Sequence, residues 1–202
     1  MGYGLSLECL DFEYIKRNLV WIGHFGEKDL ANIQSGVHKK FEGVVDIFDS
    51  RLNEMEAEQY DFGYVEHNLK YEQRYLDLFQ SLFHLNDSQL IVRFEYKSVA
   101  TYELLNIIDG LDIKEKHVLL HLMQYNYLSV KGSYFKIEDL NQVFLFAKIM
   151  TRELYTQVEI YFENIGVGIL GGFDLSLPVI VRDEMALEVL RTWVSKHNLH
   201  VR

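Results

Sequence analysis

The chain has 202 residues, of which 49% are hydrophobic, so it can bury a core without disulfides or a structural metal. Its single cysteine, Cys9, excludes an internal disulfide and favours a reducing compartment, so a cytoplasmic location is expected. The formal net charge of −10 disfavours binding to nucleic acid and to acidic lipids, and no apolar run is long enough to cross a membrane.

The negative charge is concentrated in the first part of the chain. Residues 1–88 carry 16 acidic and 8 basic side chains, a net of −8, whereas residues 89–202 have a net charge of −2. Such a surface suits a basic protein partner, because complementary charge speeds association. Solubility alone is the other explanation for the acidic balance.

A long amphipathic helix is predicted from about Glu27 to Glu58. Apolar residues recur there at gaps of three and four, which places them in one stripe on a helix. The stripe consists of Leu30, Ile33, Val37, Phe41, Val44, Phe48, Leu52 and Met55. We expect it to be buried within the chain or in a homodimer.

A second helix is predicted from Tyr64 to Leu85, and a loop follows at Asn86-Asp87-Ser88. Its inward-facing residues are expected to be Leu69, Leu76, Phe79 and Phe83. The loop coincides with the change in charge balance. The sequence therefore predicts an acidic helical region over residues 1–88 and a mixed region over residues 89–202.

The mixed region alternates short apolar runs with longer helical patterns. Strands are predicted over residues 89–96, 127–130, 134–137, 158–162, 167–170 and 175–181, and residues 198–202 are predicted as an edge strand. Helices are predicted over residues 99–108, 112–126, 140–155 and 182–197. The chain is thus expected to be an α+β protein with β-hairpins and flanking helices.

Residues 99–137 show the element order helix, helix, hairpin. The segments Leu104–Ile108, Glu115–Leu122 and Tyr127–Ile137 resemble the winged-helix superfamily in this order and in their apolar spacing. The resemblance implies DNA binding. Residues 95–139, however, hold five lysines, no arginine and seven acidic side chains, so the basic face that phosphates require is missing. We expect this segment not to bind DNA by itself.

Few residues suggest a chemical site. His117 and His121 are four residues apart on a predicted helix, a spacing at which two imidazoles can hold one metal, but no third ligand is evident. Asp174, Ser176 and His197 are the residue types of a catalytic triad, but Ser176 does not lie in a nucleophile-elbow motif. No catalytic residue, cofactor or metal is therefore predicted.

Protein binding is the function that the composition favours. Tyrosine is enriched at binding hot spots, and Tyr60, Tyr64, Tyr71 and Tyr75 lie in the acidic region as candidate anchors. We expect a non-enzymatic protein, such as an inhibitor or an immunity-type antidote that masks a basic partner. The alternatives are a winged-helix transcriptional regulator and an enzyme without a recognisable motif.

Overall fold

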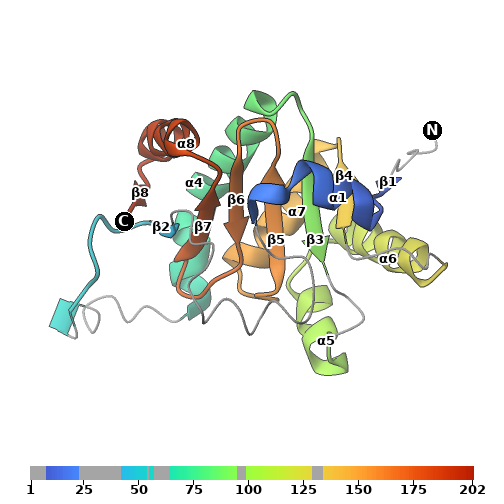
Figure 1. Ribbon diagram of the computed structural model, residues 1–202. Helices are drawn as coiled ribbons and strands as arrows, with labels where there is room; N and C mark the ends of the chain where they lie inside the picture. Colours follow the sequence, from blue (N-terminus) through green and yellow to red (C-terminus); the bar gives the residue numbers. More distant parts are fainter. Residues whose placement is uncertain (1–7, 23–41, 54, 57–63, 95–98, 129–133) are drawn as a thin grey trace.

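A computed structural model describes residues 8–22, 42–53, 55–56, 64–94, 99–128 and 134–202. Within these ranges, eight strands form one antiparallel sheet in the order β1-β4-β3-β5-β6-β7-β2-β8, and helices pack on both faces (Figure 1). The predicted α+β class is confirmed.

The secondary structure elements follow in chain order. They are β1 (Glu8–Cys9), α1 (Phe12–Asn18), the 3-10 helix η1 (Val20–Ile22), β2 (Glu42–Asp46), α4 (Tyr64–Leu85), β3 (Leu90–Phe94), α5 (Thr101–Asp109), α6 (Ile113–Leu128), β4 (Tyr134–Ile137), α7 (Leu140–Thr151), β5 (Val158–Phe162), β6 (Val167–Leu170), β7 (Leu177–Val181), α8 (Glu184–Lys196) and β8 (His200–Val201). The predicted bounds of α4, β5 and β6 are confirmed, as is the edge strand at the end of the chain.

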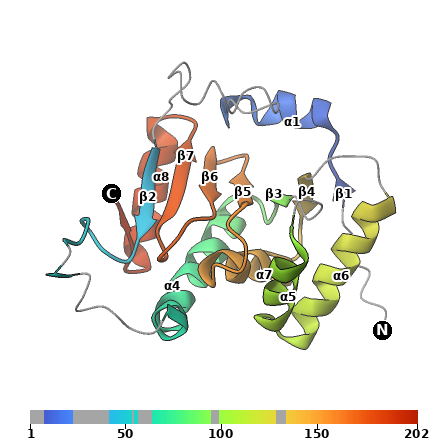
Figure 2. The same ribbon diagram turned by 90° about the horizontal axis from the view of Figure 1, so that it is seen from below.

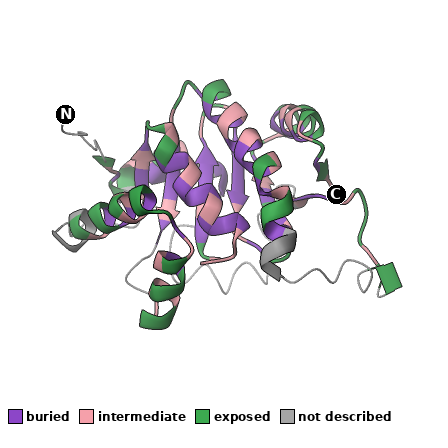
Figure 3. Ribbon diagram, turned by 180° about the vertical axis from the view of Figure 1, so that it is seen from behind, coloured by how far each residue is buried: buried purple, intermediate pink, exposed green. Residues whose placement is uncertain are grey.

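The main core lies between one face of the sheet and helices α4, α7 and α8 (Figure 2). Successive residues of a strand point to opposite faces, so alternate side chains enter this core. In β5, Val158, Ile160 and Phe162 are buried in it, and Phe162 stacks on Phe79 of α4. Figure 3 shows that the strands behind these helices consist mainly of buried residues.

Helix α1 and η1 cover part of the other face of the sheet (Figure 2). Ile15 of α1 and Leu19 directly after it are buried there together with Ile91 of β3. Trp21 of η1 meets the ring of Tyr161 edge to face, at 6.4 Å between centroids. The sheet is therefore a layer between a large helical core and a smaller cluster.

Helix α4 buries Leu76, Phe79 and Phe83 as predicted, whereas the burial predicted for Leu69 is wrong. In the turn of α4 that contains Leu69, the buried positions are taken by Asn68 and Glu72. Glu72 binds the Arg152 guanidinium beyond the end of α7. A polar contact therefore replaces the apolar contact that the periodicity of α4 predicts.

The predicted helix from Glu27 to Glu58 is wrong, because strand β2 occupies Glu42–Asp46. Val45 and Ile47, two residues apart, are buried, while Phe48 of the predicted stripe is half-buried and Met55 is exposed. Hydrogen bonding to β7 and β8, which lie more than 130 residues further along the chain, decides the conformation here. The stripe positions Leu30, Ile33, Val37 and Phe41 lie outside the described residues.

The predicted hairpin of residues 127–130 with 134–137 is also wrong. Helix α6 continues through Leu128, and β4 pairs with β3 on one edge and β1 on the other. Both edges of β4 are occupied, so no separate wing forms from this strand. The two helices of the segment, α5 and α6, are confirmed.

The described part of residues 1–88 contains strands as well as helices. Both β1 and β2 belong to the sheet that residues 89–202 complete. This part of the chain is therefore not purely helical.

Candidate functional site

Among the side chains that the structure describes, helices α5 and α6 expose four large apolar ones. Tyr102 and Leu105 lie three residues apart on α5 and are 67% and 56% exposed. Ile113 and Leu120 lie two turns apart on α6 and are 66% and 45% exposed. Residues three, four or seven apart share a helix face, so each helix presents an apolar strip to solvent. We call these four residues the α5–α6 surface.

The outward apolar residues are not needed for the core, because other residues of the same helices fill it. The buried residues are Ile107 of α5, Leu111 in the connection to α6, and Leu119 and Leu122 of α6. Helix α6 is therefore apolar on more than one side. A helix that is apolar on several sides is either enclosed by its own protein or covered by a partner. The apolar residues of α6 were visible in the sequence, so this feature could have been recognised there.

A reciprocal cap fixes the start of α6. Asp112 Oδ1 accepts a hydrogen bond from the Glu115 N–H at 3.0 Å, and Glu115 Oε2 accepts one from the Asp112 N–H at 2.9 Å. These bonds satisfy N–H groups that a helix start leaves without partners. The backbone hydrogen bond from Glu115 lowers the pKa of Asp112.

One hydrogen bond and one ion pair hold the helix pair on the body of the protein. Arg152 binds Glu72 of α4 through two bonds of 2.6 and 2.9 Å, and its third nitrogen donates to the Gly110 carbonyl at the end of α5 at 2.5 Å. Lys148 of α7 binds Glu115 of α6. The α5–α6 surface is thus presented by anchored helices, which reduces the entropy that binding would cost.

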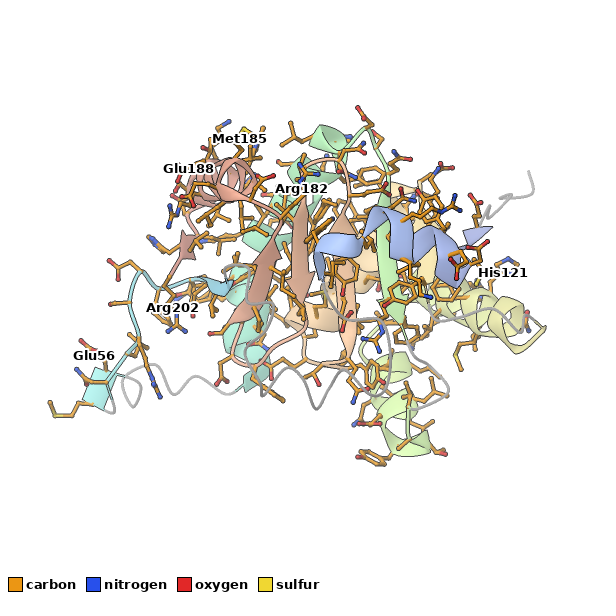
Figure 4. All side chains as sticks on the ribbon, in the orientation of Figure 1. Glu56, His121, Arg182, Met185, Glu188 and Arg202 are labelled. Carbon is orange, nitrogen blue, oxygen red and sulfur yellow. The ribbon has the colours of Figure 1, made fainter. Side chains whose placement is uncertain are left out.

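His117 and His121 are both exposed on α6, and Figure 4 labels His121 there. His117 lies four residues after Ile113 and three before Leu120, on the apolar strip itself. Across the described part of the chain, no three His, Cys, Asp or Glu side chains gather closely enough to hold a metal ion. No described residue is therefore placed as a third ligand to this pair.

The four candidate tyrosines do not form one exposed group. Tyr60 lies outside the described residues, as does the side chain of Tyr64. Tyr75 is completely buried, and its hydroxyl donates to the Leu175 carbonyl. Tyr71 is half-buried between the cations of Lys70 and Arg74. Tyr75 is therefore a core side chain, which is not accessible to a partner in this structure.

The residues of the triad pattern are separated in the structure. Ser176 Oγ donates to Asp46 at 2.6 Å, whereas His197 Nε2 lies 3.0 Å from Ser81 Oγ on α4. That second pair has the spacing of a nucleophile and a base. Among the described residues, however, no carboxylate bonds the other ring nitrogen of His197. The pair lacks the third group that would orient the histidine.

A polar cluster lies on the second face of the sheet. Arg93 of β3 binds Glu159 of β5 at 2.8 Å, and Glu159 also accepts the hydroxyl hydrogen bond of Tyr161. Burial raises the pKa of Tyr161 well above its ordinary value, and the Glu159 charge raises it further. Tyr161 is therefore a neutral donor at physiological pH, with its hydrogen bond already made inside the cluster.

Comparison with protein-family models, with curated proteins and with solved structures finds no match to this chain. Within the described ranges, none of the helices combines the length and the apolar character that spanning a bilayer requires.

Proposed function

We propose that this chain is a non-enzymatic protein-binding protein and that the α5–α6 surface contacts its partner. The observation that carries the proposal is the exposure of Tyr102, Leu105, Ile113 and Leu120 on two neighbouring helices. Single exposed apolar residues are ordinary, but several exposed apolar residues on the outer faces of two consecutive helices are typical of binding surfaces.

The chemistry of this surface suits a protein rather than a small molecule. Each of these side chains contributes about 1.5–3 kcal/mol when it passes from full exposure to full burial. Tyr102 adds a hydroxyl group that can bond a partner at the edge of the contact. Two exposed helix faces offer area and hydrogen-bonding groups, which a second protein surface can match.

Masking a partner is the mode of action that we infer. An inhibitor or an immunity-type antidote acts by covering a functional surface of another protein and requires no catalytic group. The acidic balance of the chain supports a basic partner, since opposite charges steer the encounter.

The proposal is tested by capture with matched variants. Tyr102→Ala with Leu105→Ala removes the α5 strip, and Met185→Ala removes an exposed apolar side chain from α8 at another side of the molecule (Figure 4). Each immobilised protein is incubated with a lysate of the encoding organism, and bound proteins are identified by mass spectrometry.

We expect the wild type and Met185→Ala to retain the same partner and the α5 variant to lose it. Both variants should melt like the wild type, because the changed side chains are exposed. Equal capture by all three proteins would contradict a role for the α5–α6 surface.

A further inference from the structure

The tight turn between β6 and β7 presents an aromatic ring to solvent. Phe173 is 66% exposed, and the Ser176 N–H donates to the Phe173 carbonyl at 2.9 Å. Asp174 and Leu175, the two central residues, have φ values of 53° and 59°. This left-handed backbone disfavours residues other than Gly, Asn or Asp, so Leu175 must be held in it by its surroundings.

Several contacts hold the turn in place. The Leu175 side chain is buried, and its carbonyl accepts the hydroxyl hydrogen bond of Tyr75. The Asp174 N–H donates to Glu153 Oε1 at 2.5 Å, between α7 and β5. Behind the turn the backbone is closely packed, since a Cβ on Gly172 would lie 2.0 Å from the Ser176 carbonyl oxygen. Phe173 is therefore displayed on a rigid support.

The turn lies at the same end of the sheet as α5 (Figure 1). Residues 152–157 connect the two, because Glu153 bonds the turn while Leu154 packs against Gly110 at the end of α5. Exposed apolar side chains on α5 and on the β6–β7 turn thus flank one short connection. The β6–β7 turn and the end of α5 therefore contact the same short connection.

Acidic side chains lie on α5, at the start of α6 and in the β6–β7 turn. Three of them are exposed: Asp109 at the end of α5, Asp112 directly before α6, and Asp174 in the β6–β7 turn. Glu153 between them is half-buried. A partner with cations beside apolar side chains would complement this arrangement.

The two cations nearest this acidic end, on α7 and directly after it, each form an ion pair with a glutamate. Lys148 binds Glu115, and Arg152 binds Glu72. The two lysines in the first turn of α6 are the cations of the helix pair itself. Within the described part of this end, the exposed carboxylates of Asp109, Asp112 and Asp174 outnumber these two lysines.

We propose that this end of the molecule, formed by α5, the start of α6 and the β6–β7 turn, binds a cationic segment of the partner protein. The segment places an apolar side chain against Phe173 and lysine or arginine side chains against Asp109 and Asp174. This inference rests on the proposed function and specifies the chemistry of the partner.

The test uses a displayed library of random peptides as the probe and the full chain as the immobilised target. The wild type is expected to select peptides with lysine or arginine beside a large apolar residue. The affinity of a selected peptide should fall about three- to tenfold in Asp109→Asn with Asp174→Asn, as expected for two exposed ion pairs, and about tenfold in Phe173→Ala. Raising the salt concentration should weaken binding to the wild type.

The control variant carries Asp87→Asn and Glu188→Gln. Asp87 has the same left-handed backbone as Asp174, with a φ of 58°. It lies in the connection between α4 and β3, at the opposite end of the sheet (Figure 1). Glu188 is exposed on α8 (Figure 4). This variant loses the same charge and should bind the peptide as the wild type does.

Selection of no peptide, of acidic peptides or of peptides without charge would overturn the inference, as would association of the chain with itself through this end. A second outcome would overturn the inference and leave the proposed function standing. In that outcome, Tyr102→Ala with Leu105→Ala abolishes peptide binding, whereas Phe173→Ala and Asp109→Asn with Asp174→Asn leave it unchanged. Binding that all these variants retain would contradict both.

Discussion

Asp46 is the most enclosed charge among the described side chains of the sheet, at 1% exposure. Its Oδ2 accepts hydrogen bonds from Ser176 Oγ at 2.6 Å and from Arg202 Nε at 2.9 Å, and its Oδ1 accepts one from the Phe48 N–H. Arg202 also pairs with Val44 through both backbone groups. The carboxylate, β2 and the last residue of the chain therefore stabilise one another.

Arg202→Ala should lower the free energy of unfolding by about 2–3 kcal/mol, because it leaves the buried Asp46 charge without its cation. Arg191→Ala removes an exposed ion pair with Glu188 and should cost less than about 0.5 kcal/mol. Urea unfolding of both variants measures the difference. Equal losses would show that the Asp46–Arg202 pair contributes no more than a surface pair.

Two aspartates cap helices and have lowered pKa values. Asp112 begins α6 and Asp183 begins α8, and backbone N–H groups stabilise the charged form of each. Their contribution to stability is complete above the ordinary value of 3.8 and is lost as the pH falls through the lowered pKa. Acid should therefore weaken both helix starts.

Asp112→Asn with Asp183→Asn removes these two titrations and keeps capping side chains in place. We expect stability to depend less steeply on pH below about 4 in this variant than in the wild type. Urea midpoints measured from neutral pH into this range give the slope. Identical slopes would show that neither cap contributes to the acid response.

Among the elements, α4 is the main support of the core. Phe79 is completely buried and stacks on Phe162 with 6.4 Å between ring centroids. Phe79→Ala should cost about 3–5 kcal/mol, as a cavity in a packed core does. Phe48→Ala should lower the free energy of unfolding by clearly less than Phe79→Ala does, because Phe48 is half-buried at the edge of the core. Thermal unfolding compares them, and a larger loss for Phe48→Ala would contradict this placement.

The sequence predicted correctly those elements in which the spacing of apolar residues matches the period of a single type of secondary structure. The alternating run Val158–Phe162 and the helical run Tyr64–Leu85 are confirmed for that reason. Strand β2 was missed because Val44 and Phe48 also fit helical spacing, and only pairing with the distant strands β7 and β8 decides between the two. The turn at Asp174-Leu175 carries no glycine that would have marked its left-handed backbone.

The candidate surface was only partly accessible from the sequence. The sequence predicted α5 and α6, but the outward direction of Tyr102 and Leu105 depends on Ile107 and Leu111 filling the core. The contact of the β6–β7 turn with Glu153 joins residues far from α5 in sequence. Such a surface is assembled by tertiary packing, which spacing along the chain does not reveal.

At the scale of the whole molecule, the charge predicts no binding to nucleic acid. The chain carries a net charge of −10, and the predicted wing of residues 127–137 does not form as a hairpin. A labelled random DNA duplex should therefore remain free at physiological salt. Tight binding that weakens steeply as salt rises would contradict this expectation.

The central claim is that the α5–α6 surface contacts another protein, and photo-crosslinking from position 105 tests it most directly. A photoreactive residue replaces the exposed Leu105 in one variant and the exposed Met185 of α8 in another, and both are irradiated in cells of the encoding organism. The account predicts one discrete adduct with a different protein from position 105 and none from position 185. No adduct from position 105, or the same adduct from both positions, would contradict it.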